Sequence, residues 1–380
     1  MMTSATSEET IFPNAAPMTT PTARSRTFPR ITNSLNSCAI PAMDASCSSE
    51  HPECWPRADR FSATAFFEDD TRGSRSQGRR ASRRGERQYG RVVLVERNVT
   101  MPRQGGRGAG GRHDATALVA CARLGLRARY IGKVGDDYWA RLGRRLLARD
   151  GVDVRDALPA RGSVGHASIM LVDARTGLRT GFYRRPPAYA IRPDELDRAV
   201  ITSGRLLHVD GVDAAAAAVA VRWAREAGRR VTMDGERVVE GIDRVWPAVD
   251  LLVCNPGFVA QVTGRAGVEE GLAALAARGP ARVAVTLAGD GSLGLEAGRF
   301  VRTPGFTVPV VDTNGAGDVF HGACAGGELR GGPFEWTLTF ANAVAAMKCR
   351  ALGGRRGIPR MLAVAAFLAE RGHRELAAAL

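Results

Sequence analysis

The sequence predicts an α/β protein built on a parallel, doubly wound sheet. After about residue 113, short apolar runs alternate with segments whose apolar residues recur at helical spacing. Strands separated by helices of about ten to fifteen residues are typical of a parallel sheet. The composition, with 44% hydrophobic and 24% charged residues, is that of a globular protein.

The predicted elements follow one another in a regular order after residue 113. We expect helices over residues 115–124, 138–149, 214–227, 268–277, 317–329, 335–349 and 361–371. We expect strands over residues 128–131, 167–172, 179–183, 206–209, 231–233, 251–254 and 283–287, with a turn at 173–177. The apolar run RVVLVE at 91–96 can add one more strand, although the residues after it do not continue the pattern clearly.

The N-terminal part has a different character. Residues 1–88 are rich in Ser, Thr, Pro and Arg and show neither helical nor strand periodicity. Such a segment buries too little apolar surface to offset the entropy of ordering it. We therefore predict a disordered or non-native extension over 1–88 and a folded domain over 89–380. A transit-like extension, an inaccurate start site and DNA read out of frame all fit this composition.

The formal net charge of +14 raises the question of a polyanion partner. Apart from Lys133 and Lys348, every basic residue is an arginine, and arginines are dense between residues 72 and 91. A polyanion-binding arm there would explain the charge. A compositional bias together with solvated helix faces explains it more simply, so we do not expect nucleic acid to be a partner.

Cysteine usage and hydropathy bear on the compartment. The chain has seven cysteines but no CxxC pair and no Cys/His spacing typical of metal sites. No apolar run reaches the eighteen residues that would suggest a membrane span. These observations predict a protein of the reducing cytoplasm that does not cross a membrane.

The most informative stretch begins at Val308 and reads VPVVDTNGAGDVFHGACAGG. Its β-branched run ends at Asp312, small residues follow at Gly315–Gly317, and a helix is predicted from there. The unpaired amides and the dipole at a helix N-terminus favour an anion such as a phosphate. Asp318 in the first turn can accept the proton of a hydroxyl that attacks a phosphoryl group. An aspartate that only caps the helix is the structural alternative.

This stretch closely resembles the C-terminal signature of the ribokinase/PfkB family of carbohydrate kinases, whose core is D-T-x-G-A-G-D. Further motifs occur in family order over residues 113–380. These are CARLG at 121–125, YIGKVGDD at 130–137, VDG at 209–211, VTLAGDG at 285–291, FANAVAA at 340–346 and GGRRGIP at 353–359. The resemblance implies a ribokinase-like three-layer α/β/α fold with a small β lid, which can be incomplete in its N-terminal part. It also implies ATP-dependent phosphorylation of a sugar or sugar-derivative hydroxyl.

The resemblance also implies roles for individual residues. Asp318 would be the catalytic base, and the amides of Gly315, Ala316 and Gly317 would form the anion hole. The other implied sites are the nucleotide-binding residues Thr286, Gly289, Gly291, Asn342 and Asn255, the sugar-binding residues Gly110, Gly111, Thr116 and Asp318, and the monovalent-cation site at Asp312, Gly353 and Gly357. ATP and Mg²⁺ are the implied cofactors, with K⁺ in many members. A homodimer is compatible with this interpretation.

Two departures from the family pattern leave a second function open. Thr116 stands where the sugar-binding element has Asn, and Phe258 stands where the N-x-x-E motif that starts at Asn255 has Glu. A nucleotide- or sugar-binding protein that has lost its catalytic power is therefore the alternative to an active kinase. For Arg184 and Arg185, binding of a phosphorylated or acidic sugar and a solvated surface both remain possible.

Overall fold

The computed structural model describes residues 91–95, 115–163, 167–172 and 179–380. The predicted extension at 1–88, the turn at 173–177, and Gly110 and Gly111 lie outside these ranges. Of the arginine-rich stretch at 72–91, only Arg91 is described by the structure.

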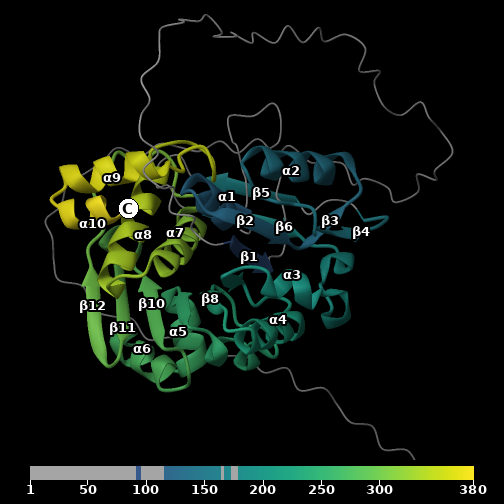
Figure 1. Cartoon of the computed structure of the whole chain (residues 1–380), viewed down its shortest axis with the longest axis horizontal. Coiled ribbons are helices and arrows are strands. Elements are labelled where there is room, and N and C mark those ends of the chain that lie inside the picture. Colours follow the sequence, from purple (N-terminus) through teal and green to yellow (C-terminus); the bar gives the residue numbers. More distant parts are fainter. Residues whose placement is uncertain (1–90, 96–114, 164–166, 173–178) are drawn as a thin grey trace, which may run out of the picture. The chain divides into compact units, whose positions relative to one another are not determined.

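In the described part of the chain, the central sheet has eight strands in the order β12-β11-β10-β9-β8-β7-β1-β2 (Figure 1). Neighbouring strands from β2 to β10 are parallel, and β11 and β12 complete the sheet as an antiparallel hairpin. The strands are β1 Arg91–Val95, β2 Arg127–Ile131, β7 Leu206–Val209, β8 Arg230–Gly235, β9 Leu251–Cys254, β10 Arg282–Thr286, β11 Ser292–Glu296 and β12 Arg299–Thr303. The predicted parallel sheet is confirmed.

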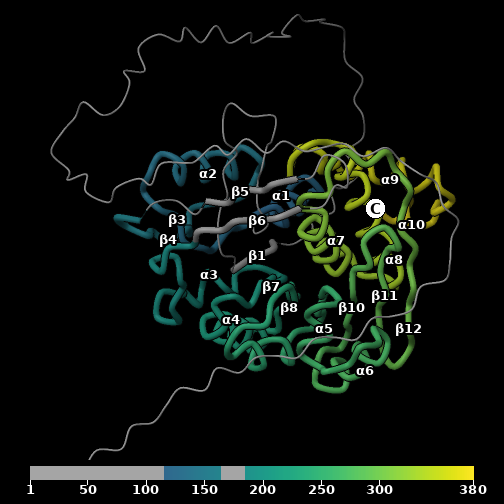
Figure 2. The backbone as a smooth tube through the Cα atoms, turned by 180° about the vertical axis from the view of Figure 1, so that it is seen from behind, coloured from purple at the N-terminus to yellow at the C-terminus, as the bar shows by residue number. Residues whose placement is uncertain are grey.

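Helices cover both faces of this sheet (Figures 1 and 2). One face carries α1 Thr116–Arg123, α2 Tyr138–Arg149, α7 Ala316–Arg330, α8 Phe334–Lys348, α9 Met361–Glu370 and α10 Arg374–Ala379. The other carries α3 Arg198–Thr202, α4 Ala214–Glu226, α5 Pro256–Thr263 and α6 Val268–Ala276. None of these described helices combines the length and the hydropathy that a membrane span needs.

The strand sequences explain the three layers. In β9, Leu251 and Val253 pack with the α7 and α8 side, whereas Leu252 and Cys254 pack with the α4 to α6 side. Successive side chains of a strand point to opposite faces, so a continuous apolar run requires cover on both.

Among the described residues, two short strand pairs form sheets of their own, apart from the central sheet. Here β3 Lys133–Gly135 pairs in parallel with β4 Leu158–Ala160, and β5 Ala167–Val172 pairs antiparallel with β6 Arg179–Arg184. These pairs correspond to the predicted small β lid. Single turns of 3₁₀ helix lie at Pro187–Tyr189, Pro193–Glu195, Ile242–Arg244, Trp246–Ala248 and Ala288–Asp290.

The predicted helices and strands are all present, and their ends differ from the predicted ones by no more than about two residues. The run at 91–96 does form a strand, β1, which lies between β2 and β7 inside the sheet. The elements not predicted are short or punctuated by Gly and Pro: β3, β4, β11, β12, α3, α5 and α10. Such segments carry too few periods of a pattern to be recognised.

One helix contact positions the site. A Cβ built on Gly322 of α7 would lie 2.4 Å from the carbonyl oxygen of Ala117 in α1. Because glycine has no side chain, α1 and α7 approach each other closely. This contact brings the start of α1 beside the start of α7.

Candidate active site

The start of α7 lies at the carboxyl edge of the parallel strands. His321, in the first turns of α7, contacts Asp234 near the end of β8, with His321 Nε2 and Asp234 Oδ1 3.1 Å apart. Asn255 and Thr286 stand at the ends of β9 and β10. Ligands of open α/β sheets bind in the crevice outside this edge, so the predicted site residues lie where a substrate site is expected.

The bend before α7 is built from backbone. Gly315 is the N-cap residue and has left-handed dihedral angles, φ 77° and ψ 9°. A side chain there would be strained, and its Cβ would lie 3.1 Å from the Gly354 carbonyl oxygen and 3.4 Å from Thr116 Cγ2. Glycine is therefore required by both the dihedral angles and the close neighbours.

Two of the three predicted anion-hole amides have no protein acceptor within the described residues. The Ala316 amide donates to the Thr313 carbonyl at 3.1 Å and closes the turn. The amides of Gly315 and Gly317 make no such bond in the described part of the chain. Unpaired amides at the positive end of a 15-residue helix can bind an anion.

Asp318 is the third residue of α7 and retains 7% of its surface exposed. A carboxylate in the first turn is favoured by the helix dipole, and it lies at the same end of the helix as the Gly315 and Gly317 amides. The arrangement can bind a phosphate and accept a proton from a neighbouring hydroxyl.

A buried histidine pair connects α7 to the sheet, and no sequence pattern predicts it. His321 lies one turn after Asp318, and its ring centroid is 5.9 Å from that of His208 in β7. His208 Nδ1 is 2.8 Å from the hydroxyl of Thr232 in β8. Alternation along β7 and β8 places His208, Thr232 and Asp234 on the face that α7 covers.

The two histidines have opposite pKa shifts. Burial lowers the pKa of His208 to about 3, and the neighbouring His321 adds to the effect. Burial also disfavours a charged His321, but Asp234, Asp318 and Glu236 together outweigh it and raise the pKa of His321 above its ordinary value. We therefore assign His321 as the cation and His208 as the neutral ring.

We expect His321→Gln to destabilise the protein most at acidic pH. A raised pKa in the folded state stabilises the fold fully below the unfolded pKa of about 6.5, and this is lost as pH rises through the folded pKa. The difference in unfolding free energy between wild type and variant, measured with urea, should therefore shrink from pH 6 to pH 9. His208→Gln is the control, because the lowered pKa of His208 affects stability only as pH falls below about 6.5. A His321 difference that does not vary with pH would contradict the assignment.

The predicted nucleotide residues come together at the β10–β11 turn. Thr286 ends β10, and a Cβ built on Gly291 would lie 2.2 Å from the Thr303 carbonyl oxygen. A Cβ built on Gly305 would lie 2.2 Å from the Gly289 carbonyl oxygen. The loops at 286–292 and 303–305 thus pack backbone against backbone.

Asn342 holds these loops together. Its Nδ2 donates to Thr303 Oγ1 at 3.0 Å and to Ser292 Oγ at 3.1 Å, and the residue is 6% exposed. The sequence predicted a nucleotide contact for Asn342, whereas here its amide nitrogen is engaged by the protein.

Asn255 caps α5. Its Oδ1 accepts the Phe258 amide at 2.8 Å, and its Nδ2 donates to the Glu236 carbonyl at 3.2 Å. Phe258 is 1% exposed and packs in the core of the α4 to α6 face. The residue at the position of the family Glu is therefore part of the core, and the acidic residue whose backbone carbonyl Asn255 contacts is the exposed Glu236.

The three residues of the predicted cation site meet around the end of α8. Asp312 Oδ2 accepts the Gly353 amide at 2.8 Å. A Cβ built on Gly357 would lie 2.1 Å from the carbonyl oxygen of Lys348. The structure thus brings Asp312, Gly353 and Gly357 into one loop cluster beside the anion hole.

Of the predicted sugar-binding residues, Gly110 and Gly111 lie outside the described residues. Thr116 begins α1, is fully buried, and has its methyl group beside Gly315. Its hydroxyl has no hydrogen-bond partner within the described part of the chain.

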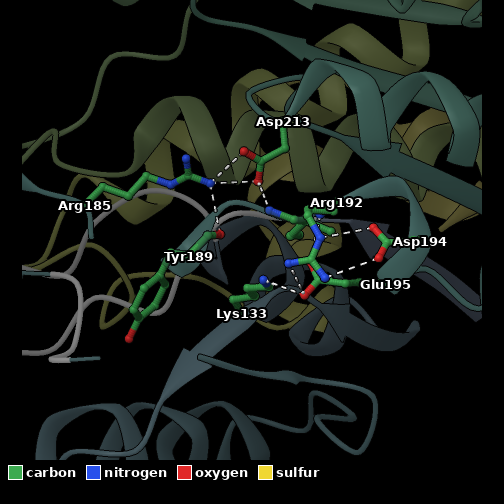
Figure 3. A network of polar contacts seen from close by, with 8 residues as sticks. Lys133, Arg185, Tyr189, Arg192, Asp194, Glu195 and Asp213 are labelled. Carbon is green, nitrogen blue, oxygen red and sulfur yellow. Dashed lines mark hydrogen bonds and ion pairs between the residues drawn. The ribbon is translucent and has the colours of Figure 1, made fainter. Parts of the chain in front are cut away.

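Arg185 has a different role from either of the two predicted. Its guanidinium donates to both carboxylate oxygens of Asp213 at 2.7 Å and to the Tyr189 carbonyl at 3.0 Å (Figure 3). It is therefore a partly buried ion-pair residue that fixes the segment after β6. Nearby, Lys133 Nζ and Glu195 Oε1 are 2.7 Å apart (Figure 3).

Sequence reasoning missed four side chains of this region: Asp234, His321, His208 and Lys348. One signal could have found Asp234, because polar residues at the carboxyl ends of parallel strands face the ligand crevice. The histidines pair across 113 positions of sequence, and no local pattern links them.

Comparisons with known proteins identify the family of the chain. Residues 87–361 match the family model described as pfkB family carbohydrate kinase. An ATP-dependent ribose-1-phosphate kinase of Halopiger xanaduensis is 32% identical over 269 residues, which are 70% of this chain and 88% of that protein. Fructokinase-2 of Solanum habrochaites is 26% identical over 233 residues, which are 57% of this chain and 71% of that protein.

Solved structures confirm the fold. The fructokinase of Xylella fastidiosa with bound ATP superposes with a TM-score of 0.64 at 20% identity, over 74% of this chain and 99% of that one. The ribokinase of Arabidopsis thaliana complexed with ribose and ATP gives a TM-score of 0.60 at 20% identity, over 73% and 98%. With the family model matching well over half of its length, the chain belongs to the pfkB family of carbohydrate kinases.

Proposed function

We propose that the protein transfers the γ-phosphoryl group of Mg·ATP to a hydroxyl of a sugar or sugar derivative. One observation carries the proposal: the carboxylate of Asp318 adjoins the amides of Gly315 and Gly317, which have no protein acceptor among the described residues, at the carboxyl edge of the sheet. Phosphoryl transfer needs little covalent help from the protein, so a positioned base and fixed donors are sufficient machinery.

In this proposal Asp318 accepts the proton of the attacking hydroxyl. The Gly315 and Gly317 amides donate to the γ-phosphate oxygens as negative charge develops on them, with Ala316 closing the turn that aims them. Because these dipoles are fixed before the reaction, little reorganisation is needed in the transition state.

The nucleotide would lie along the Thr286–Gly291 turn. The side-chain-poor loops there let an adenine nucleotide approach the backbone, and Asn342 keeps the two loops in register. We propose that Asp234 and Glu236 give the phosphate end an acidic border that favours ATP as its magnesium complex. Carboxylate oxygens are preferred partners of Mg²⁺ and its bound waters.

For the acceptor, we propose a pentose, a phosphorylated pentose or a ketohexose. Support comes from the relatives, which are named as kinases of ribose 1-phosphate and of fructose. Thr116 supports it as well, because its methyl group lies beside Gly315 and its hydroxyl, which has no partner within the described residues, can accept or donate a hydrogen bond.

The second candidate function is binding without transfer. The burial of Phe258 favours it, because that position then offers the nucleotide phosphates no carboxylate. Such a protein would bind ATP but would not release ADP in the presence of any sugar.

A substrate screen separates the two functions. The full-length chain is incubated with Mg·ATP and panels of sugars, sugar phosphates, sugar acids and nucleosides, and ADP release is followed by a coupled assay. We expect ADP release that depends on a compound from one of these substrate classes, with a kcat on the order of 10 s⁻¹, the median for enzymes. ATP binding by calorimetry with no ADP release across the panels would favour the binding protein. If the chain neither bound ATP nor released ADP, both functions would be excluded.

A further inference from the structure

The chain has only two lysines among its 53 lysines and arginines, and both are buried. Lys133 is ion-paired with Glu195 at 2.7 Å. Lys348 ends α8 with 0% of its surface exposed, and its Nζ donates to the Asp312 carbonyl oxygen at 2.8 Å. A buried lysine side chain therefore stands at the loop where the sequence predicts a monovalent cation.

The polar atoms of Asp312 are all engaged at this loop. Its Oδ1 accepts the Asn314 amide and its Oδ2 accepts the Gly353 amide, each at 2.8 Å. Its own amide and that of Val311 donate to the Cys349 carbonyl at 3.1 and 2.8 Å. The ammonium of Lys348 takes the remaining carbonyl oxygen.

These contacts do not fit a second cation. An ion bound to the Asp312 carboxylate would compete with two amide hydrogens and would share this residue with the Lys348 side chain. Like charges in one desolvated loop repel each other strongly. The compact, three-donor head of lysine can do part of what the ion would do: bring a positive charge to this loop and orient the Asp312 carbonyl oxygen.

The loop that Lys348 holds is the support of the anion hole. Asp312 precedes Gly315 by one turn, and the Gly354 carbonyl oxygen lies against Gly315. Movement of either segment would turn the amides of Gly315 and Gly317 away from a phosphate.

We propose that the Lys348 ammonium serves as a built-in cation that positions the anion hole, so that this kinase needs no monovalent ion. The proposal rests on the proposed function of the Gly315–Asp318 bend. It replaces the K⁺ site expected at Asp312, Gly353 and Gly357, and it makes Lys348 a positioning residue that touches neither substrate.

The first test uses the unaltered full-length chain. Its turnover of the sugar found by the screen is compared in potassium, sodium and tetramethylammonium chloride at equal ionic strength. We expect the same rate in the three salts. Stimulation by K⁺ of about tenfold or more over tetramethylammonium would overturn the proposal.

The second test removes the charge with Lys348→Met, a side chain of similar length. We expect kcat to fall roughly 10–100-fold and to recover in part with K⁺ or NH₄⁺ but not with tetramethylammonium. Lys133→Met removes the other buried lysine and is the matched control, for which we expect no recovery with K⁺. A K⁺ response of Lys348→Met no larger than that of the control would count against the built-in cation.

A third readout needs no sugar, so it separates failure of this proposal from failure of the proposed function. An ion that binds only the folded state raises the melting temperature by mass action. Potassium chloride should therefore raise the Tm of Lys348→Met above its value in tetramethylammonium chloride, but should not do so for the unaltered chain. A potassium-specific rise in the unaltered chain would overturn the proposal, even if Lys348→Met failed to fold.

Discussion

The Asp318→Asn variant is expected to lose about 10²–10⁴-fold in kcat, the range that removal of a general base produces. Asparagine keeps the size and the hydrogen-bonding capacity of the side chain but cannot accept the hydroxyl proton. Because the Gly315 and Gly317 amides remain, the affinity for Mg·ATP should change little. Steady-state kinetics with the screened sugar and calorimetry with an unreactive ATP analogue measure the two quantities separately.

Glu335→Gln is the matched control for this substitution. Glu335 is an exposed acidic residue in the first turn of α8, so its loss removes the same favourable interaction with a helix dipole. We expect the control to keep its turnover. Near-normal turnover of Asp318→Asn would instead remove Asp318 from the reaction and leave it as a helix-terminal carboxylate.

A second acid–base pair stands close enough to be considered as the base. His321 lies one turn after Asp318 in α7, and its Nε2 is 3.1 Å from Asp234 Oδ1 of β8. However, His321 is 7% exposed, and the acidic groups around it raise its pKa, which favours the protonated ring that cannot accept a further proton. We therefore infer that the pair holds α7 against β8, while Asp318 is the group that accepts a proton.

The fold could be predicted because its signals are local. Each parallel strand is a short apolar run, and each intervening helix is long enough to show its period. The hairpin of β11 and β12 was missed because Gly294 and charged residues break its pattern, although Gly294 is needed where a Cβ would lie 2.6 Å from Phe334 Cε1. The contact with Phe334 that requires a glycine at this position is visible only in the three-dimensional structure.

The site could be predicted only in part, for a related reason. Gly315 to Asp318 are adjacent in sequence, so the bend, the amides and the carboxylate could be inferred together. Asn342 and Lys348 are adjacent to no other site residue, and their partners Thr303 and Asp312 lie more than thirty positions away. Whether a polar side chain faces a ligand or the protein depends on such long-range contacts, which no motif records.

The Gly315→Ala variant is expected to lose roughly 10²–10³-fold in kcat, about the effect of removing one donor from an anion hole. Alanine at φ 77° is strained, and its Cβ would press on the Gly354 carbonyl oxygen at 3.1 Å. The bend would have to relax, and relaxation turns the Gly315 and Gly317 amides away from the phosphate. The unfolding free energy should also fall, by about 1–2 kcal/mol for a left-handed residue that is not glycine.

Gly125→Ala is the control that separates the effect of backbone strain on stability from the effect of the bend on kcat. Gly125 follows the C-cap of α1, has φ 85°, and a Cβ there would meet nothing within 4 Å. Both variants carry the cost of a left-handed alanine, but only Gly315→Ala disturbs the amides of the bend. Urea unfolding should therefore show a loss of stability in both, whereas kcat should fall in Gly315→Ala alone. Equal turnover of the two variants would mean that the bend does not bind the transferred phosphate, because its geometry would then have no influence on the reaction.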